Sequence, residues 1–424
     1  MKKTIVLLIS LFIGFTVLLS AQQKNKVKYT TRKGDKVFGE ILEKQAKIQE
    51  KKDEETGKIR QRQAKEAGEE VQRMILSDST GIFPPKSPEE FKQYFYFPPQ
   101  AQDFTNTCWT FAATSYLESE IFRLTGKKIK LSEMWAVYFG LIDKCRRYID
   151  ERGNSHVAGG GEPIAAIHTW KQHGIVPLDV YPGVLEKGDR HNHAPMMEEV
   201  ISYLTYINRN NLWNEEENMK HITLILDNHL GKPPESFTYN GKTMTPVEFL
   251  QNETGLNPDD YYSVISTSYF PFYTRGEFRV PDNWGHSKEY INLPLDVWYG
   301  IVKKAIPAGQ TLVMVGDVTE AGKLAEADIA FIPTFDIPEE YIDQDSREYR
   351  IFNKTTEDDH AIHVVGYKQV KGKDWYLIKD SARSSRYGKY PGFYFFRGDF
   401  IKLKMLALTV HKDLLKDILP KLEK

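Results

Sequence analysis

The stretch Gln102-Asp-Phe-Thr-Asn-Thr-Cys108-Trp109 decides how the rest of the chain is interpreted. The residues that follow, Thr110–Glu118, are typical of a helix, so Cys108 is expected at a helix N-terminus. The positive end of the helix dipole stabilises a thiolate there, and the thiolate is the reactive form of cysteine. The side-chain amide of Gln102 is placed to meet an oxyanion beside the sulfur, with the Cys108 N–H as a second donor.

Two downstream segments supply the groups that a cysteine nucleophile needs. The first is His360-Ala-Ile-His-Val-Val-Gly-Tyr367, which offers an imidazole as base. The second is Trp375-Tyr-Leu-Ile-Lys-Asp380-Ser381, in which Asp380 offers a group to orient that imidazole. A nucleophile, a base and an orienting group together predict nucleophilic catalysis through Cys108.

The order of these motifs resembles the papain-like cysteine peptidases, and the similarity runs from about Tyr94 to His411. Four further motifs resemble their bleomycin hydrolase (aminopeptidase C) branch: Leu131-Ser-Glu-Met-Trp-Ala-Val-Tyr-Phe, Gly159-Gly-Gly-Glu-Pro, His173-Gly-Ile-Val-Pro177 and Tyr290-Ile-Asn-Leu-Pro-Leu-Asp296. The resemblance implies an α+β, two-lobed papain-like fold. A helical lobe would carry the nucleophile, an antiparallel β lobe would carry the base, and a helical insertion would lie between them.

The resemblance also implies a role for each site residue. Gln102 would be the oxyanion donor, Cys108 the nucleophile, His360 the base and Asp380 the orienting residue. The glycines Gly159, Gly160 and Gly161 would let a substrate backbone approach the cleft. An alternative interpretation of these glycines is that they only start the helix at Pro163, where proline suits the first turn.

Asp380 departs from the family pattern, which has asparagine followed by Ser-Trp, whereas Ser381 is followed here by Ala382. A carboxylate would still orient the imidazole, and it would favour the charged form, moving the alkaline limb of the pH profile upward. The missing tryptophan would expose that hydrogen bond to water unless another aromatic covers it. The alternative is an ordinary aspartate at a strand end.

His363 is the rival base. Residues three apart in a strand point to opposite faces, so we expect only one of the two histidines to face the thiol. The positions of Ala361 and Gly366-Tyr367 in the family motif favour His360. His363 is then predicted to be a packed or exposed histidine.

The N-terminus has the pattern of a secretory signal peptide, in which Lys2 and Lys3 precede an apolar run from Ile5 to Leu19. We therefore predict a signal peptide at 1–21 and an exported, periplasmic or extracellular protein with no membrane span after cleavage. An uncleaved anchor is the alternative. A charged extension would follow at 22–80. The catalytic domain, 81–424, would comprise a helical lobe (about 100–194), an insertion (about 195–289), a β lobe (about 290–411) and a tail (412–424).

Composition limits the partners that the chain is expected to have. The net charge of −1 lacks the excess of positive charge that is typical of nucleic-acid-binding proteins. The histidines lack a zinc-like spacing, and the chemistry needs no metal or other cofactor. Of the two cysteines, Cys145 is expected to be a buried free thiol on a helix, because pairing with Cys108 would abolish activity.

The expected reaction is the hydrolysis of peptide substrates through an acyl-enzyme. In the bleomycin hydrolase branch a C-terminal arm lies in the cleft and its carboxylate meets the free amine of the substrate, which would make this chain an aminopeptidase. Whether the tail at 412–424 reaches the site is open, so an open-cleft endopeptidase is the alternative. A catalytically silent peptide-binding module is the alternative of another class. The branch forms hexamers, which the residue pattern here does not test.

Overall fold

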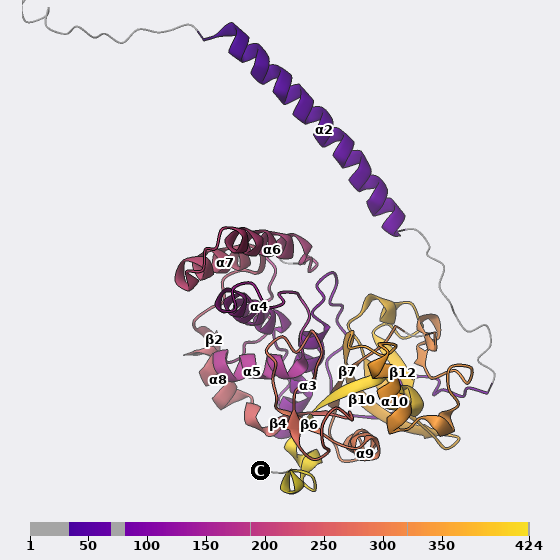
Figure 1. Cartoon of the computed structure of the whole chain (residues 1–424). Helices are drawn as coiled ribbons and strands as arrows, with labels where there is room; N and C mark the ends of the chain where they lie inside the picture. Colours follow the sequence, from indigo (N-terminus) through magenta and orange to yellow (C-terminus); the bar gives the residue numbers. More distant parts are fainter. Residues whose placement is uncertain (1–33, 69–80, 187, 320, 423–424) are drawn as a thin grey trace, which may run out of the picture. The chain divides into compact units, whose positions relative to one another are not determined.

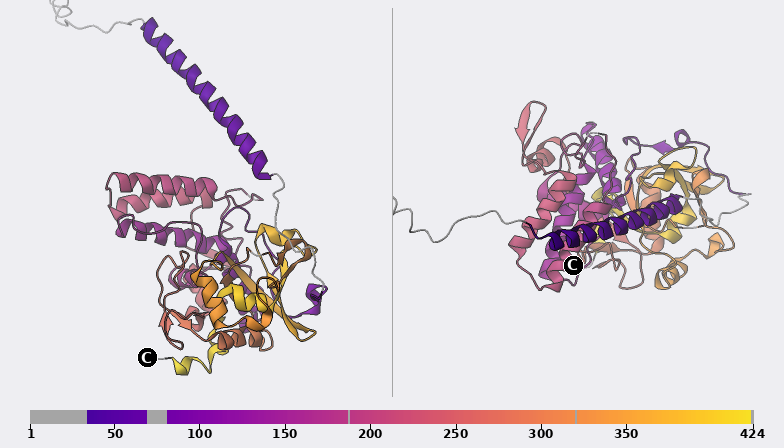
Figure 2. Two further views of the ribbon diagram at one scale, coloured as in Figure 1. Left: turned by 45° about the vertical axis from the view of Figure 1, so that its right-hand side comes forward. Right: turned by 90° about the horizontal axis from the view of Figure 1, so that it is seen from above.

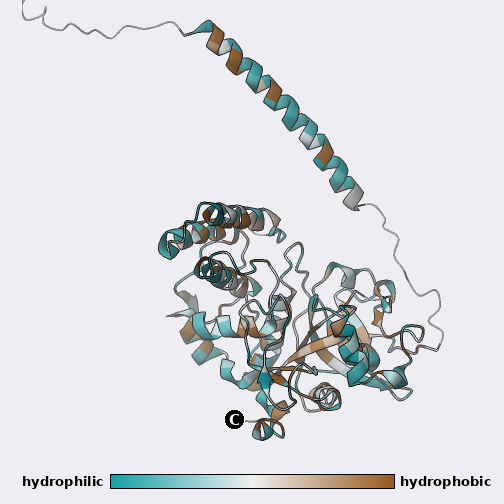
Figure 3. Ribbon diagram, in the orientation of Figure 1, coloured by the Kyte–Doolittle hydropathy of each residue, from teal (hydrophilic) through white to brown (hydrophobic). Residues whose placement is uncertain are grey.

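The computed structural model describes residues 34–68, 81–186, 188–319 and 321–422, which belong to two separate units, 1–73 and 74–424. In the first unit, helix α2 spans Lys36–Gly68, and Figures 1 and 3 show it as a single, mostly hydrophilic helix. The predicted signal peptide at 1–21 lies outside the described residues. Among the residues that are described, no helix is both long and apolar enough to cross a bilayer.

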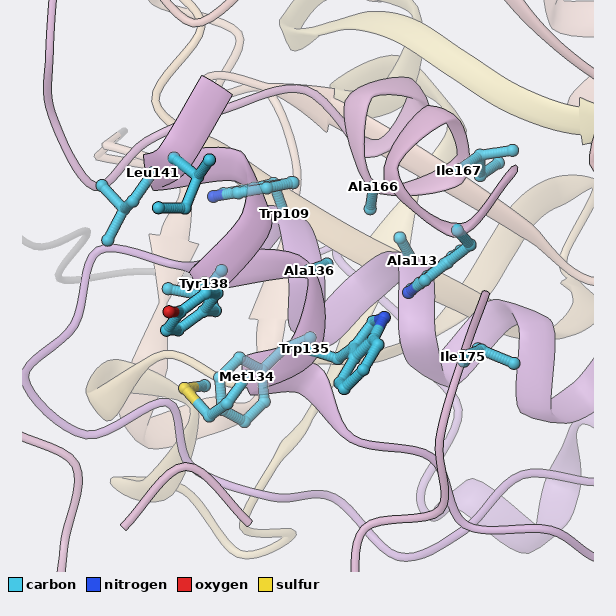
Figure 4. Packing of buried hydrophobic residues seen from close by; sticks show 14 of the residues in the cluster. Trp109, Ala113, Met134, Trp135, Ala136, Tyr138, Leu141, Ala166, Ile167 and Ile175 are labelled. Carbon is cyan, nitrogen blue, oxygen red and sulfur yellow. The ribbon is translucent and has the colours of Figure 1, made fainter. Parts of the chain in front are cut away.

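Three helices form the core of the helical lobe: α3 (Cys108–Thr125), α4 (Glu133–Asp150) and α5 (Pro163–His173). Local sequence signals set their ends. The Ser132 hydroxyl caps α4 by accepting the Trp135 backbone N–H at 3.1 Å, and α3 ends at Gly126, whose positive φ suits glycine. Figure 4 shows aromatic and aliphatic side chains from these helices, Trp109 and Trp135 among them, packed together between the ribbons.

The insertion begins with helices and ends with strands. Its helices are α6 (Ala194–Arg209), α7 (Glu215–Leu230) and α8 (Pro246–Glu253), with a hairpin of β2 (Phe237–Tyr239) and β3 (Lys242–Met244) before α8. Helices α6 and α7 run side by side against α4 in Figure 1 and in the left view of Figure 2. The last part supplies the sheet strand β4 (Tyr261–Ile265) and the short β5 (Arg275–Gly276), so the insertion is helical only in its first part.

The β lobe is built on one large sheet whose central strands are antiparallel. They follow the order β4-β13-β7-β10-β11-β12, where β7 is Leu312–Gly316, β10 His360–Val370, β11 Lys373–Lys379, β12 Phe393–Arg397 and β13 Met405–His411. The edges add β6 (Tyr290–Asn292) and β9 (Ile329–Ala330) in parallel pairs, β8 (Lys323–Leu324), and β1 (Lys92–Gln93) on β10. Helices α9 (Leu295–Ala305), α10 (Gln344–Phe352) and α11 (Gly398–Lys404) complete the lobe.

The contact between the lobes positions the site. Helix α3 packs on β10 and β7. Cys108 begins α3 and His360 begins β10, so the predicted nucleophile and base belong to elements in direct contact. The tail after β13 lies at the opposite end of α3. Asp413 pairs with Arg123 at 3.8 Å, and Arg123 is fifteen residues beyond Cys108, about 22 Å along a helix. Leu414, Leu415 and Ile418 are buried there in the core of the β lobe.

We expect Trp135→Ala to destabilise the catalytic unit by about 3–5 kcal/mol, because it removes a fully buried ring from the core of the helical lobe. It also removes the hydrogen bond from the Trp135 indole to the Gly174 carbonyl. Chemical denaturation would measure the free energy of unfolding. Phe352→Ala is the control, because Phe352 is 78% exposed and should change stability by less than about 0.5 kcal/mol. Equal effects of the two changes would contradict this packing.

Candidate active site

Cys108 is the first residue of α3 and is half-buried. The loop before it is tightly turned, with Asp103 and Asn106 at positive φ, a region that Asp and Asn tolerate better than most residues. The Thr105 hydroxyl donates to the Gln102 carbonyl at 2.8 Å and bonds the Thr107 hydroxyl at 2.6 Å. Thr107 makes no side-chain cap on α3, and its carbonyl accepts the N–H groups of Thr110 and Phe111, which leaves the Cys108 N–H as the candidate donor to a developing anion.

His360 and Asp380 form a buried pair beside Cys108. His360 Nε2 lies 2.7 Å from Asp380 Oδ1, and their side chains are 7% and 1% exposed. Burial favours the neutral imidazole, but the charges and hydrogen bonds of Asp380 and Cys108 outweigh it and raise the pKa of His360 to about 10. Burial likewise works against the carboxylate, yet His360 holds the pKa of Asp380 down at about 2. The pair is therefore a carboxylate and an imidazolium at neutral pH.

The sequence left open what shields this hydrogen bond in place of the missing tryptophan. The turn after Asp380 folds back over it. Asp380 Oδ1 also accepts the Ala382 backbone N–H at 2.9 Å, and the buried Ser385 hydroxyl donates to the Ala382 carbonyl at 2.7 Å. The Asp380 backbone N–H donates to the Gly392 carbonyl at 2.9 Å. A compact turn, with a backbone donor to the carboxylate, thus keeps water from the pair.

Gln102 is held by the residue after Asp380. The Gln102 backbone N–H donates to the Ser381 carbonyl at 3.0 Å, and the Ser381 hydroxyl donates to Gln102 Oε1 at 2.7 Å. Because the side-chain oxygen is taken by that hydroxyl, the side-chain nitrogen of Gln102 remains as the donor. Ser381 is thus a positioning residue. The sequence motif contains it but was not used to predict a role for it, although its place directly after the orienting aspartate could have indicated one.

His363 contacts the helix that carries Cys108 but lies away from the thiol. It bonds Ser115 of that helix at 2.8 Å, about two turns beyond Cys108. Burial, aided by the nearby Lys379 charge, lowers the pKa of His363 well below its usual value. His363 is therefore a packed, neutral histidine, as predicted.

The three predicted substrate-contacting glycines lie beside Trp109, the neighbour of Cys108. The Trp109 indole donates to the Gly159 carbonyl at 2.9 Å. A Cβ on Gly161 would lie 3.0 Å from the Trp109 ring, and one on Gly159 would lie 2.9 Å from the Thr105 carbonyl oxygen. Close packing within the protein is thus one reason for glycine here, and their contact with substrate stays a prediction.

The remaining cysteine is not part of the site. Cys145 is free and fully buried in α4, and burial raises its pKa to about 12, so it is an inert thiol. In the described part of the chain, no group of three or more His, Cys, Asp or Glu residues is arranged to hold a metal ion.

No family model matches the chain. It is 34% identical to human cathepsin L2 over 100 residues, which are 24% of this chain and 27% of the relative. It is 32% identical to bovine pro-cathepsin H over 111 residues, or 26% of this chain and 30% of the relative. The chain thus matches less than a third of the length of either relative.

The structure is also similar to PepW from Lactobacillus rhamnosis. The TM-score is 0.60 at 16% sequence identity, covering 77% of this chain and 84% of PepW. At this identity the likeness concerns the fold, and it spans both lobes. The chain therefore has the two-lobed α+β papain-like fold that its motifs predict, and it resembles the papain-like cysteine peptidases.

Proposed function

We propose that the chain is a cysteine peptidase, with Cys108 as nucleophile, His360 as acid and base, and Asp380 as the residue that orients His360. The observation that carries the proposal is the buried 2.7 Å bond between His360 Nε2 and Asp380 Oδ1. Because Nε2 is engaged by Asp380, the other ring nitrogen is left to interact with Cys108, whose charge helps to raise the pKa of His360. A thiol beside an imidazolium is the arrangement that activates a cysteine nucleophile.

The reaction would proceed in two halves. The Cys108 thiolate attacks the peptide carbonyl, the oxyanion is met by the Gln102 side-chain N–H and the Cys108 backbone N–H, and the His360 imidazolium gives its proton to the departing amine. This leaves a thioester on Cys108 and a neutral His360. His360 then takes a proton from water as the water attacks the thioester, and the acid product leaves with the thiolate–imidazolium pair restored.

The finer proposal is an aminopeptidase, supported by the motifs shared with the bleomycin hydrolase branch. The device used in that branch, a C-terminal arm in the cleft, does not fit the described tail, because Asp413 to Ile418 is held at the end of α3 remote from Cys108. An open-cleft endopeptidase is the competing outcome, and a silent peptide-binding module is the outcome if no turnover occurs.

We expect Cys108→Ala to abolish hydrolysis of peptide substrates and labelling by an epoxysuccinyl reagent. Cys145→Ala is the matched control and should keep both, because Cys145 is buried and remote from the reaction. Hydrolysis of a peptide series by the three proteins, with mass spectrometry of the labelled site, is the measurement. Turnover that survives Cys108→Ala, or no turnover by the wild type, would contradict the proposal.

Asp380→Asn should shift the alkaline limb of kcat/KM to lower pH by roughly 1–3 units. The Asp380 carboxylate helps to hold the pKa of His360 at about 10, so its neutral isostere lets the imidazolium lose its proton earlier as pH rises. Asp345→Asn, which neutralises an exposed carboxylate on α10, serves as control. A pH–rate profile of the three proteins is the measurement, and coincident alkaline limbs would contradict the stabilisation of the His360 imidazolium by the Asp380 charge.

Gln102→Ala should lower kcat by about 100-fold or more with little change in KM, because the lost donor acts on the oxyanion rather than on the bound substrate. Ser381→Ala should lower kcat less, because the Gln102 amide remains but is no longer fixed by the 2.7 Å bond. Steady-state kinetics of both variants tests this order. A larger loss for Ser381→Ala, or a loss in KM alone, would be inconsistent with these roles.

A further inference from the structure

The segment 278–287, between β5 and β6, is a rigid turn rather than a loose loop. Asn283 is 5% exposed and braces it from within. The Asn283 amide donates to the carbonyls of Phe278 at 2.9 Å and Ser287 at 3.1 Å, and its oxygen accepts the Ser287 backbone N–H at 3.0 Å. Phe278 packs against Tyr290 with ring centroids 5.4 Å apart, which ties the turn to the start of β6.

This turn lies on the glycine segment beside Trp109. The carboxylate of Asp282 occupies the space where a side chain on Gly160 would begin. Lys144 also holds the glycine segment, because its ammonium group donates to the carbonyls of Ala158, at 2.8 Å, and Gly160. The Lys144 ammonium also lies 5.6 Å from the Trp109 ring and 5.8 Å from the Trp284 ring. The turn is thus packed directly against the neighbours of Cys108.

Three carboxyl groups meet at this place from both lobes. Glu162 follows the glycines at the start of α5, Asp358 precedes His360 by two residues, and Asp282 comes from the turn. The Glu162 carboxyl interacts with both of the others. Burial and the nearby charges of Asp358 and Asp282 raise the pKa of Glu162, and burial, opposed by a hydrogen bond with Glu162, raises that of Asp358 to about 7. The ionised forms of these carboxyl groups are therefore disfavoured by removal from water and by one another's charge, and a cation bound here would stabilise them.

Glu162 supplies a second observation, independent of charge. It is only 2% exposed, and its Oε1 atom is buried without a hydrogen-bond partner in the described structure. Leaving a buried carboxylate oxygen unpaired is costly, and a ligand that donates a hydrogen bond would remove that cost. Lys144, whose charge acts on Asp282, is already engaged by two backbone carbonyls, and the Tyr290 hydroxyl is a neutral donor of the chain that interacts with Glu162. A ligand with N–H groups would add charged donors to this place.

Cavities reach the cluster on both sides of the turn. One, of about 340 Å³, is lined by Asp358 together with Phe278, Arg279 and Pro281. The other, of about 180 Å³, is lined by Glu162, Asp282 and Trp284. Each cavity is thus lined by residues of the turn together with at least one carboxyl residue of the cluster.

We propose that Glu162, Asp358 and Asp282 form a subsite that binds the α-ammonium group at the substrate's N-terminus, with the turn 278–287 closing the cleft behind it. An ammonium group brings the positive charge and the N–H donors that these carboxyl groups lack. The proposal rests on the proposed peptidase function and deepens it. It assigns recognition of the substrate's N-terminus to these three side chains in place of a C-terminal arm.

The experiment compares wild type, Glu162→Gln and Asp358→Asn on aminoacyl-coumarin amides with a free or an acetylated amine. The two changes keep the shape of the side chain and remove its charge. Asp345→Asn is the matched control, because this exposed carboxylate on α10 lines neither cavity and is not part of the cluster. Titration with the epoxysuccinyl reagent counts intact sites in every sample, so that loss of folded protein is not mistaken for loss of selectivity.

The wild type should prefer free amines, and each variant should lose about 10–100-fold of kcat/KM on free-amine substrates while acetylated ones change little. Turnover by the wild type with the preference unchanged in both variants would overturn this proposal alone. Absence of any Cys108-dependent turnover would overturn the proposed function as well. A third set of substrates consists of acetylated peptides with Lys or Arg before the cleaved residue. These peptides offer a positive side chain but no free N-terminus, so they show which of the two groups the subsite binds. Variant losses confined to that set would overturn the assignment to the N-terminus.

Discussion

The buried hydrogen bond between His360 and Asp380 is the constraint on which the site depends. It joins the first residue of β10 to the turn after β11, so it can form only when these neighbouring strands are in their observed register. Because α3 packs on β10, the same register brings His360 to the N-terminus of the helix that carries Cys108. The sheet therefore holds base and orienting group, and the helix brings the nucleophile to them.

The surroundings of that pair show how a departure from the family pattern is accommodated. An aspartate in place of asparagine introduces a second buried charge, which is costly unless it is paired and hydrogen-bonded. Here His360 supplies the opposite charge and the Ala382 N–H a second hydrogen bond. The side chains of His360 and Asp380 are both buried although the tryptophan of the family pattern is absent. Asp380 and the turn after it thus occur together in this chain, where the family pattern has asparagine and tryptophan.

Much of this architecture could be predicted from the chain. Helices begin at Cys108 and Pro163, as the sequence predicted, and His360 begins strand β10 while Asp380 directly follows β11. The motifs that carry chemistry are local, so each could be recognised separately. The structure brings Gln102, Ser381, Asp380 and His360 into one hydrogen-bonded set, which the motifs implied only through the family resemblance.

Contacts between distant segments could not be predicted. Nothing in the sequence near Asp282 indicates that it rests against Gly160, and Lys144 gave no signal beyond being a charged residue in a mostly buried helix. His363 bonds Ser115 of α3, a contact between the lobes that the local sequence does not indicate. These misses share one cause, since each depends on how the lobes and the insertion pack rather than on local pattern.

The central claim is that His360 is an imidazolium held by Asp380 beside Cys108, and NMR titration of the His360 ring tests it most directly. In the wild type the ring should stay charged through neutral pH and lose its proton only near pH 10. Titration of His360 near the ordinary histidine value of about 6.5 would contradict the account, because the pair would then be neutral where the enzyme is proposed to act.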